Sequence, residues 1–133
     1  MKKSILSFYI FLLVFAGACN QYSSNPNLAL ARDFIDAYYV FADQEKALLL
    51  CTGHAAENLK SEIELLKNVS NRQEAYRTRS ITFELKQQLH QENTEMYLFE
   101  LTIKLPQLGE RKQLVNIAID TTSNKIKFFD TLK

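Results

Sequence analysis

The hydrophobic pattern of this chain changes its period after Asn71, and this change constrains the fold more than any other feature. Before it, apolar residues recur every three or four positions, which is typical of amphipathic helices. After it, apolar and polar residues alternate, as at Ile81, Phe83 and Leu85. Alternation with a period of two indicates strands with one buried and one wet face. Helices followed by strands predict an α+β domain.

Three helices are expected before the change. Asn25 and Pro26 are typical of a helix start, and the apolar face that follows contains Leu28, Ala31, Phe34, Ile35, Tyr38 and Phe41 or Ala42. Asp43 is expected to cap a short second helix that runs to Cys51. Thr52 is expected to cap a third, whose apolar face contains Ala55 or Ala56, Leu59, Ile63, Leu66 and Val69. The charged residues on its other sides (Glu57, Lys60, Glu62, Glu64, Lys67) are interpreted as solvated surface rather than a catalytic carboxylate pair.

Four strands are expected after the change, over 81–85, 97–105, 115–119 and a segment around Ile126 and Phe128. Short polar connections between them suit an antiparallel meander covered on one face by the helices. We expect that face to contain Phe83, Phe99, Leu101, Ile117 and Phe128. Its expected partners on the helices are Leu28, Phe34, Ile35, Tyr38, Leu59 and Ile63.

Residues 1–18 have the three-part layout of a secretory signal. Lys2 and Lys3 precede an uncharged apolar run from Ile5 to Val14, and small residues follow it. A transmembrane helix needs about 20 apolar residues, and here the sequence turns polar directly after Cys19. The pattern therefore favours a cleaved signal over a permanent membrane anchor.

The end of this segment, Phe15-Ala16-Gly17-Ala18-Cys19, resembles the lipobox of bacterial lipoproteins, although Ala16 stands where that family usually has a branched aliphatic residue. The resemblance implies that Cys19 becomes the mature N-terminus and carries a diacylglycerol and a further acyl chain such as palmitate. Residues 19–25 would then tether a domain spanning 26–133 to a membrane of the bacterial cell envelope. Asn20, rather than Asp, after the cysteine implies the outer membrane where there is one. The alternative is ordinary cleavage before an unmodified Cys19, which would give a soluble secreted protein.

Charge and residue usage exclude several kinds of site. The formal net charge of +1 offers no basic patch for nucleic acid. Two Cys and two His are too few for a disulfide scaffold or a dense Cys/His metal site, and we expect no cofactor. Cys51 follows three leucines and is interpreted as a buried structural residue. His54 and His90 are interpreted as surface or capping residues.

The expected architecture, together with the segment from Phe34 to Leu48, resembles the NTF2-like, cystatin-related cone fold as found in small bacterial lipoproteins. In that segment an amphipathic helix ends at a small-Asp turn, Ala42-Asp43, and a helix beginning Glu45-Lys46-Ala47-Leu48 follows. The resemblance spans residues 27 to 132 and implies a cone between sheet and helices. The candidate lining residues of that cone are Phe34, Tyr38, Phe83, Phe99 and Phe128.

Two functions remain open on the sequence, because NTF2-like families include isomerases and dehydratases as well as non-enzymatic binding and dimerisation modules. The first is a non-enzymatic envelope lipoprotein that binds a protein partner or a small apolar ligand, or pairs with a second copy through the sheet. The second is a small-molecule isomerase or dehydratase that uses Tyr38, Tyr39 or Asp36. No full catalytic set can be matched to these residues, so none is assigned.

Overall fold

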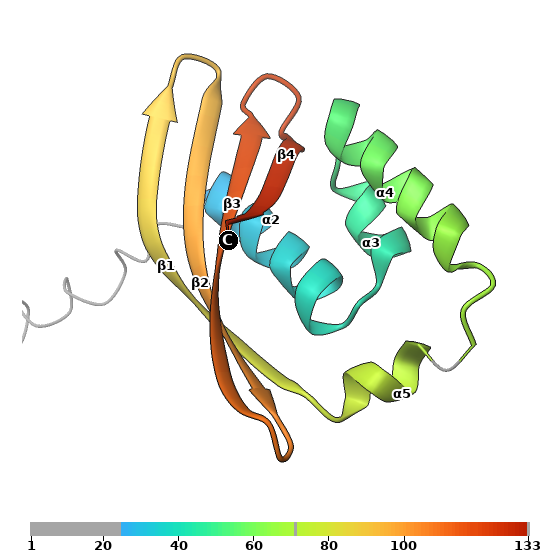
Figure 1. The fold of residues 1–133 in the computed structure, drawn as a ribbon. Helices are drawn as coiled ribbons and strands as arrows, with labels where there is room; N and C mark the ends of the chain where they lie inside the picture. Colours follow the sequence, from blue (N-terminus) through green and yellow to red (C-terminus); the bar gives the residue numbers. More distant parts are fainter. Residues whose placement is uncertain (1–24, 71, 133) are drawn as a thin grey trace, which may run out of the picture.

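The computed structural model describes residues 25–70 and 72–132, so the predicted signal at 1–18, Cys19 and most of the tether lie outside the described residues. Helices precede strands along the chain, as the change of period predicts. Four antiparallel strands form one open sheet, and the helices pack against its concave side (Figure 1). The predicted α+β architecture, N-terminal helices on a curved four-stranded antiparallel sheet, is confirmed.

The first helix, α2 (Pro26–Ile35), begins at the predicted cap. The side-chain oxygen of Asn25 accepts hydrogen bonds from the backbone N–H groups of Asn27 at 3.0 Å and Leu28 at 3.4 Å. These bonds satisfy amide groups that have no partner within the helix. Asn25 also fixes the start of the helix to the sheet, because its amide nitrogen donates to the hydroxyl of Tyr97 at 3.1 Å.

The apolar pattern predicts that the first helix continues regularly as far as Phe41 or Ala42, but its geometry changes after Ile35. A π-helical turn, η2 (Asp36–Val40), follows α2, and the N–H of Phe41 reaches back to the carbonyl of Asp36 at 2.8 Å. The wider turn allows the consecutive residues Tyr38 and Tyr39 to pack against the core. Phe41 is 68% exposed, whereas Ala42 is half-buried, so of the two alternatives at this point of the apolar face the structure favours Ala42.

Two short helices and one longer helix complete this half of the molecule. In α3 (Gln44–Leu49), Asp43 is the cap that the sequence predicts, accepting from the N–H of Lys46 at 2.9 Å. Thr52 precedes α4 (Gly53–Leu66) as expected, but its side chain makes no capping bond. The third of these helices, α5 (Arg72–Arg77), was not predicted.

The strands are β1 (Ser80–Gln91), β2 (Thr94–Leu105), β3 (Gly109–Asp120) and β4 (Lys125–Leu132). They pair in the order β1-β2-β3-β4, so each strand contacts the next along the chain. Tight connections join them, and each contains a residue in the left-handed region: Glu92, Gln107 and Asn124, at φ of 48°, 68° and 52°. This is the predicted meander, with strands longer than the alternating segments indicated.

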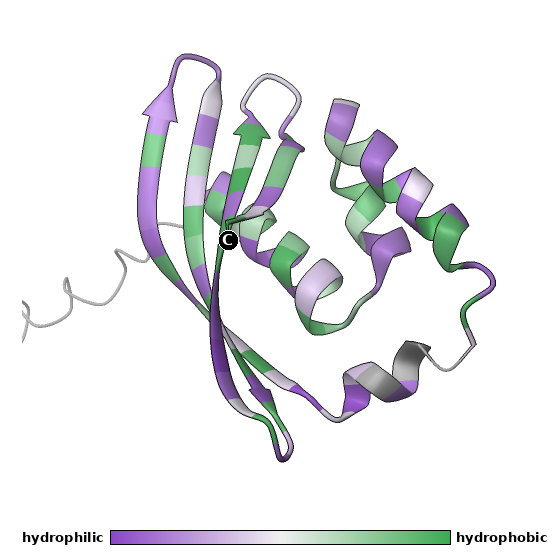
Figure 2. Cartoon of the chain, in the orientation of Figure 1, coloured by the Kyte–Doolittle hydropathy of each residue, from purple (hydrophilic) through white to green (hydrophobic). Residues whose placement is uncertain are grey.

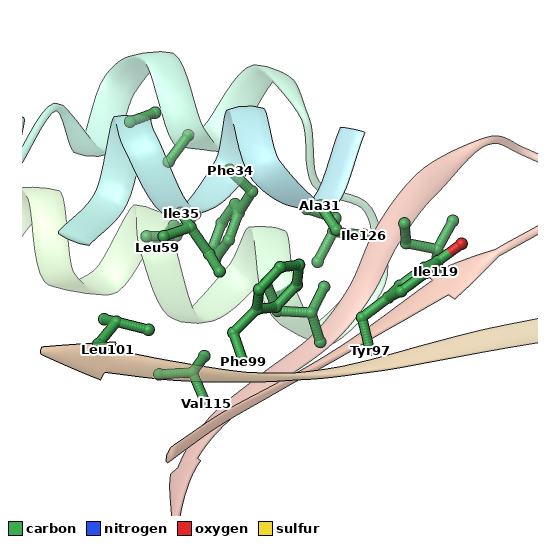
Figure 3. Close-up of a cluster of buried hydrophobic side chains, with 14 residues drawn as sticks. Ala31, Phe34, Ile35, Leu59, Tyr97, Phe99, Leu101, Val115, Ile119 and Ile126 are labelled. Atoms are coloured by element: carbon green, nitrogen blue, oxygen red, sulfur yellow. The ribbon is translucent and has the colours of Figure 1, made fainter. Parts of the chain in front are cut away.

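The core lies between the concave face of the sheet and helices α2, η2, α3 and α4. Figure 2 shows hydrophobic residues recurring along the helix and strand segments that meet there. In Figure 3, Phe34, Ile35 and Leu59 point from the helices toward Phe99 and Val115 on the sheet, and all five side chains are fully buried. Tyr97, Leu101, Ile117 and Ile119 complete the sheet side of this cluster.

The last strand departs from simple alternation, and one predicted core residue is therefore wrong. In the β3–β4 register, Ile119 faces Ile126 but Ala118 faces Phe128, so Lys127 is an extra residue that forms a bulge. The bulge reverses the side on which later residues lie. Phe128 is 47% exposed, while Phe129 packs inward with its ring centroid 4.8 Å from that of Phe34.

The edge of β4 is partly covered by the connection between α3 and α4. The N–H of Thr52 donates to the carbonyl of Ile126 at 2.8 Å, and the N–H of Ile126 donates to the carbonyl of Leu50 at 2.9 Å. The two bonds place Cys51 beside Ile126 as a single parallel bridge. They also explain why Thr52 does not need a side-chain cap to fix the start of α4.

Candidate functional site

An open groove lies between the turn that precedes α3, the inner side of α4 and helix α5. Its volume is about 780 Å³. The apolar part of its lining consists of Ala42, Ile63, Leu66 and Val69. The polar part consists of Asp43, Gln44, Glu45, Glu74, Tyr76 and Arg77. Figure 1 shows α4 and α5 on the two sides of this region, away from the hairpin that joins β1 to β2.

Local geometry at Ala42 shapes one side of the groove. Ala42 has a φ of 51°, a conformation that residues other than glycine seldom adopt. It allows the chain to reverse between η2 and α3, so that Asp43 can cap α3 while its neighbour Gln44 is buried, at 5% exposed. Ile63 and Leu66 lie on the side of α4 that lines the groove. The prediction that Ile63 packs on the sheet is therefore wrong, because Ile63 lines the groove and is not part of the core cluster.

A hydrogen-bonded cluster joins η2, α3 and α4 beside the groove. The hydroxyl of Tyr38 donates to Oε2 of Glu62 at 2.8 Å, and the amide of Gln44 donates to Oε1 at 3.3 Å. Burial, followed by the bond to Glu62, holds the pKa of Tyr38 well above its ordinary value. Tyr38 is therefore a hydrogen-bond donor here and not a base.

Glu62 is the residue of this cluster that the sequence interpretation missed. The helix pattern predicts a solvated charge at Glu62, yet this residue is half-buried and both its carboxylate oxygens accept hydrogen bonds. Its position was a usable signal, because it lies three residues after Leu59 and four before Leu66, at the border of the apolar face of α4.

A second cluster ties α5 to η2. The guanidinium of Arg79 donates to the backbone carbonyl of Tyr39 at 2.7 Å and lies 4.1 Å from the ring centroid of Tyr76. Burial lowers the pKa of Arg79, and its Nε is buried without a hydrogen-bond partner. Stacking on Tyr76 favours the charged form of the guanidinium. The pair holds Tyr76 where it lines the groove.

The predicted cone-lining residues form packed structure rather than the wall of this groove. Phe34 and Phe99 are fully buried, and Phe83 packs edge-on against Phe99 with ring centroids 5.9 Å apart. Tyr38 stacks on Phe34 at 5.5 Å. Phe128 is directed away from this aromatic cluster, and Phe129 takes the place predicted for it.

Of the candidate catalytic residues, Tyr38 and Tyr39 pack edge-on with ring centroids 4.8 Å apart, but their hydroxyl groups bond to different partners. Tyr39 bonds to Thr131, with its hydroxyl oxygen 3.2 Å from that of the threonine. The pKa of Asp36 is raised by burial and by nearby Asp33. His54 and His90 lie on exposed surface, His54 at the start of α4 and His90 near the end of β1, as predicted.

Cys51 agrees in part with its predicted structural role. It is a free cysteine of intermediate exposure that packs against the core cluster. Burial raises the pKa of its thiol to about 12, despite the lowering effect of Lys125. A thiol with so high a pKa is a poor nucleophile near neutral pH.

Among the described residues, no group of three or more His, Cys, Asp or Glu side chains could hold a metal ion. None of the helices in residues 25–70 and 72–132 is long and apolar enough to cross a membrane.

The chain enters the folded domain through a polar cluster at the start of α2. Tyr97 accepts a bond from Asn25 and donates one to Glu95. The bond from Tyr97 is the largest cause of a lowered pKa at Glu95, and Asn27 and Asn25 add further bonds. The imidazole Nδ1 of His90 lies 3.7 Å from the Glu95 carboxylate. This cluster fixes Asn25, the first described residue, against β2.

No protein-family model matches this sequence, and no curated protein matches it either. The groove and its two clusters therefore have to be interpreted from their own chemistry.

Proposed function

We propose that this chain is a non-enzymatic, lipid-anchored protein of the bacterial cell envelope, and that its domain binds a segment of a protein partner in the groove between α4 and α5. The anchor rests on the resemblance of the sequence around Cys19 to a lipobox. The observation that supports binding is the groove itself, a hollow of about 780 Å³ whose lining combines apolar and charged residues.

The position of the groove suits an anchored binding domain. The tether ends at Asn25, which is bonded to Tyr97, whereas Ala42 at the groove follows the far end of η2. The helical residues between these points span about 20 Å at 1.5 Å per residue. The tether from Cys19 to Asn25 reaches at most about 20 Å when fully extended. An anchored domain of this kind would keep its attachment point near the membrane and its groove open to the aqueous compartment.

The charges of the groove specify the kind of partner. Among the lining residues whose side chains the structure describes, Asp43, Glu45 and Glu74 supply three carboxylates and Arg77 supplies one cation. Ile63, Leu66 and Val69 offer apolar contacts in the same lining. A partner segment that combines apolar side chains with lysine or arginine is complementary to this lining. A wholly apolar small ligand would leave the carboxylates without a counter-charge.

The anchor is tested by metabolic labelling with palmitate. Wild-type protein should be labelled and Cys19→Ala should not. Equal labelling of the two proteins, or a wild type that is soluble without detergent, would remove the anchored function.

The groove is tested with two fluorescent peptides, one alternating Leu with Lys and the other alternating Leu with Glu. The Lys peptide should bind more tightly, and Glu74→Lys should weaken its binding by about tenfold, equivalent to about 1.4 kcal/mol. Glu57→Lys is the matched control, because Glu57 also lies on a helix but does not line the groove. Its side chain is 73% exposed and lies 3.5 Å from the exposed His54. Equal binding of both peptides, or equal effects of the two substitutions, would contradict the proposed partner chemistry.

One observation favours an isomerase or dehydratase as a second candidate, namely the Glu62 carboxylate beside Tyr38. A general base needs a free lone pair directed at its substrate. Each oxygen of Glu62 already accepts one hydrogen bond, from Tyr38 or Gln44, and Glu62 is not among the described residues that line the groove, where a substrate would lie. The arrangement therefore serves better as a link between helices than as a proton acceptor.

A further inference from the structure

The outer face of the sheet carries a row of apolar side chains across all four strands. In the register of the sheet, Leu89 on β1 faces Met96 on β2, Met96 faces Ala118 on β3, and Ala118 faces Phe128 on β4. We call these four residues the outer apolar row. The bulge at Lys127 is what adds Phe128 to it, since regular alternation would have turned that ring inward.

Further apolar residues extend the outer apolar row along the sheet. Leu98 lies next to it on β2, and Leu114 pairs with Leu132 beyond. Leu89, Phe128, Leu132 and Leu114 are 50%, 47%, 44% and 36% exposed. The solvated face of an antiparallel sheet is normally polar. Apolar side chains gathered on one such face mark an interaction surface more often than chance exposure.

This face carries both a hollow and a projecting side chain. A hollow of about 230 Å³ is lined by Gln87, Leu89, Met96, Leu98, Asn116 and Leu132. Phe128, which is not part of that lining, lies at the β4 end of the outer apolar row. A surface with a ring beside an apolar hollow can pair with its own copy, because a two-fold axis brings each ring to the hollow of the other chain.

The charges beside the outer apolar row balance each other. Lys86 lies 2.9 Å from Glu84 and 3.5 Å from Glu100, and Lys112 lies 3.1 Å from Glu100. Two cations and two carboxylates thus form one neutral group on the same face, so this group would not make two copies of the face repel each other. A membrane surface is a poorer occupant, because surfaces that lie on anionic lipid carry an excess of Lys and Arg.

We propose that the outer face of the sheet binds the same face of a second copy of this chain, with Phe128 of each copy in the hollow of the other. Gln87 and Asn116 offer amide groups for hydrogen bonds across the contact. Asp130 lies between Phe128 and Leu132 on the edge strand, where it can stay in water at the rim.

Site-specific photo-crosslinking of the full-length protein in its own membranes tests this proposal. Benzoylphenylalanine replaces Phe128 in one variant and Leu108 in the other. Leu108 is the matched control, because it is apolar and 82% exposed but lies at the β2–β3 connection, away from the outer apolar row. We expect a product of doubled mass from position 128 alone, with peptides of this chain on both sides of the link. A product with lipid or with another protein, equal yields from both positions, or no product at 128 would overturn the proposal.

A second comparison guards against misfolding as an explanation. Leu89→Glu places a charge in the contact, while Thr82→Glu places one on the exposed outer face of the same strand. With the crosslinker at 128, Leu89→Glu should lower the yield of doubled product at least about tenfold. Thr82→Glu should leave the yield within about twofold. Equal yields from the two variants, with equal unfolding midpoints, would contradict the proposed contact.

Discussion

The two faces of the sheet are built from the same four strands but differ in how far their apolar side chains are buried. On the concave face, alternate residues of β2 such as Tyr97, Phe99 and Leu101 are fully buried under the helices. On the outer face, Leu89 and Phe128 keep about half of their surface exposed, at 50% and 47%. Alternation therefore identifies the residues that share a face, but the number of apolar faces depends on irregularities such as the bulge at Lys127.

The largest effect is expected on the concave face. Phe99→Ala should lower the free energy of unfolding by about 3–5 kcal/mol, because it leaves a cavity between β2 and the helices. A small domain has only about 5–15 kcal/mol in total. Urea unfolding of the lipid-free chain starting at Gln21 measures this loss, with a constant slope as the check on two-state behaviour.

Lys104→Ala is the control on the same strand, since Lys104 is on the outer face and its side chain is 65% exposed. It should change the free energy of unfolding by less than about 1 kcal/mol. Equal sensitivity of Phe99 and Lys104 would mean that both faces of β2 are covered in the isolated chain.

An intermediate effect is expected at Cys51, which joins the helical layer to the edge of β4. Cys51→Ser should cost about 1–3 kcal/mol by placing a hydroxyl against the core. The native thiol should react slowly with a maleimide and rapidly in denaturant, because burial raises its pKa to about 12. Fast labelling of the native protein would contradict this packing.

Tyr38→Phe should have a smaller effect, about 1–2 kcal/mol, because it leaves one oxygen of Glu62 without its donor. Ser61→Ala is the matched control. It also removes one hydroxyl from this region, but that hydroxyl is exposed and bonds only to the backbone of Glu57. Equal losses in the two variants would show that the Tyr38–Glu62 bond does not link the helices.

The smallest effect is expected at Glu95 and depends on pH. The bond from Tyr97 lowers the pKa of Glu95 below its ordinary value of 4.5 in the folded state, so the unfolded state binds the proton more readily. The stability that Glu95 contributes is then full above pH 4.5 and falls as the pH drops through the lowered pKa. Glu95→Gln should flatten this acid limb of the stability curve, measured by urea unfolding from pH 6 down to about pH 3. An unchanged limb would contradict the bond.

The sequence predicts much of this structure where the local pattern is regular. The caps at Asn25 and Asp43, the buried positions that recur every second residue along β2 and the order of helices and strands all follow from residue type and spacing. The π turn at 36–40 adds one residue to a helical turn, and the bulge at Lys127 adds one residue to a strand. The residue types around these two positions do not indicate either insertion.

The candidate site was less accessible to sequence interpretation. The groove joins residues near Ala42, the end of α4 and helix α5, and nothing local shows that these segments meet. The polar residues that line it have the composition of ordinary surface. Only the position of Glu62 at the border of the apolar face of α4 gave a signal. Lipidation of Cys19 and the partner proposed for the groove remain predictions.

The central claim is that the bulge in β4 places Phe129 in the core and leaves Phe128 on a second apolar face. Phe129→Ala and Phe128→Ala test it directly, since they make the same change at adjacent positions. At low protein concentration, where self-association contributes least, Phe129→Ala should lower the free energy of unfolding by about 2–4 kcal/mol and Phe128→Ala by less than about 1 kcal/mol. A loss at Phe128 equal to or larger than the loss at Phe129 would contradict the register of β4 and, with it, the outer apolar row.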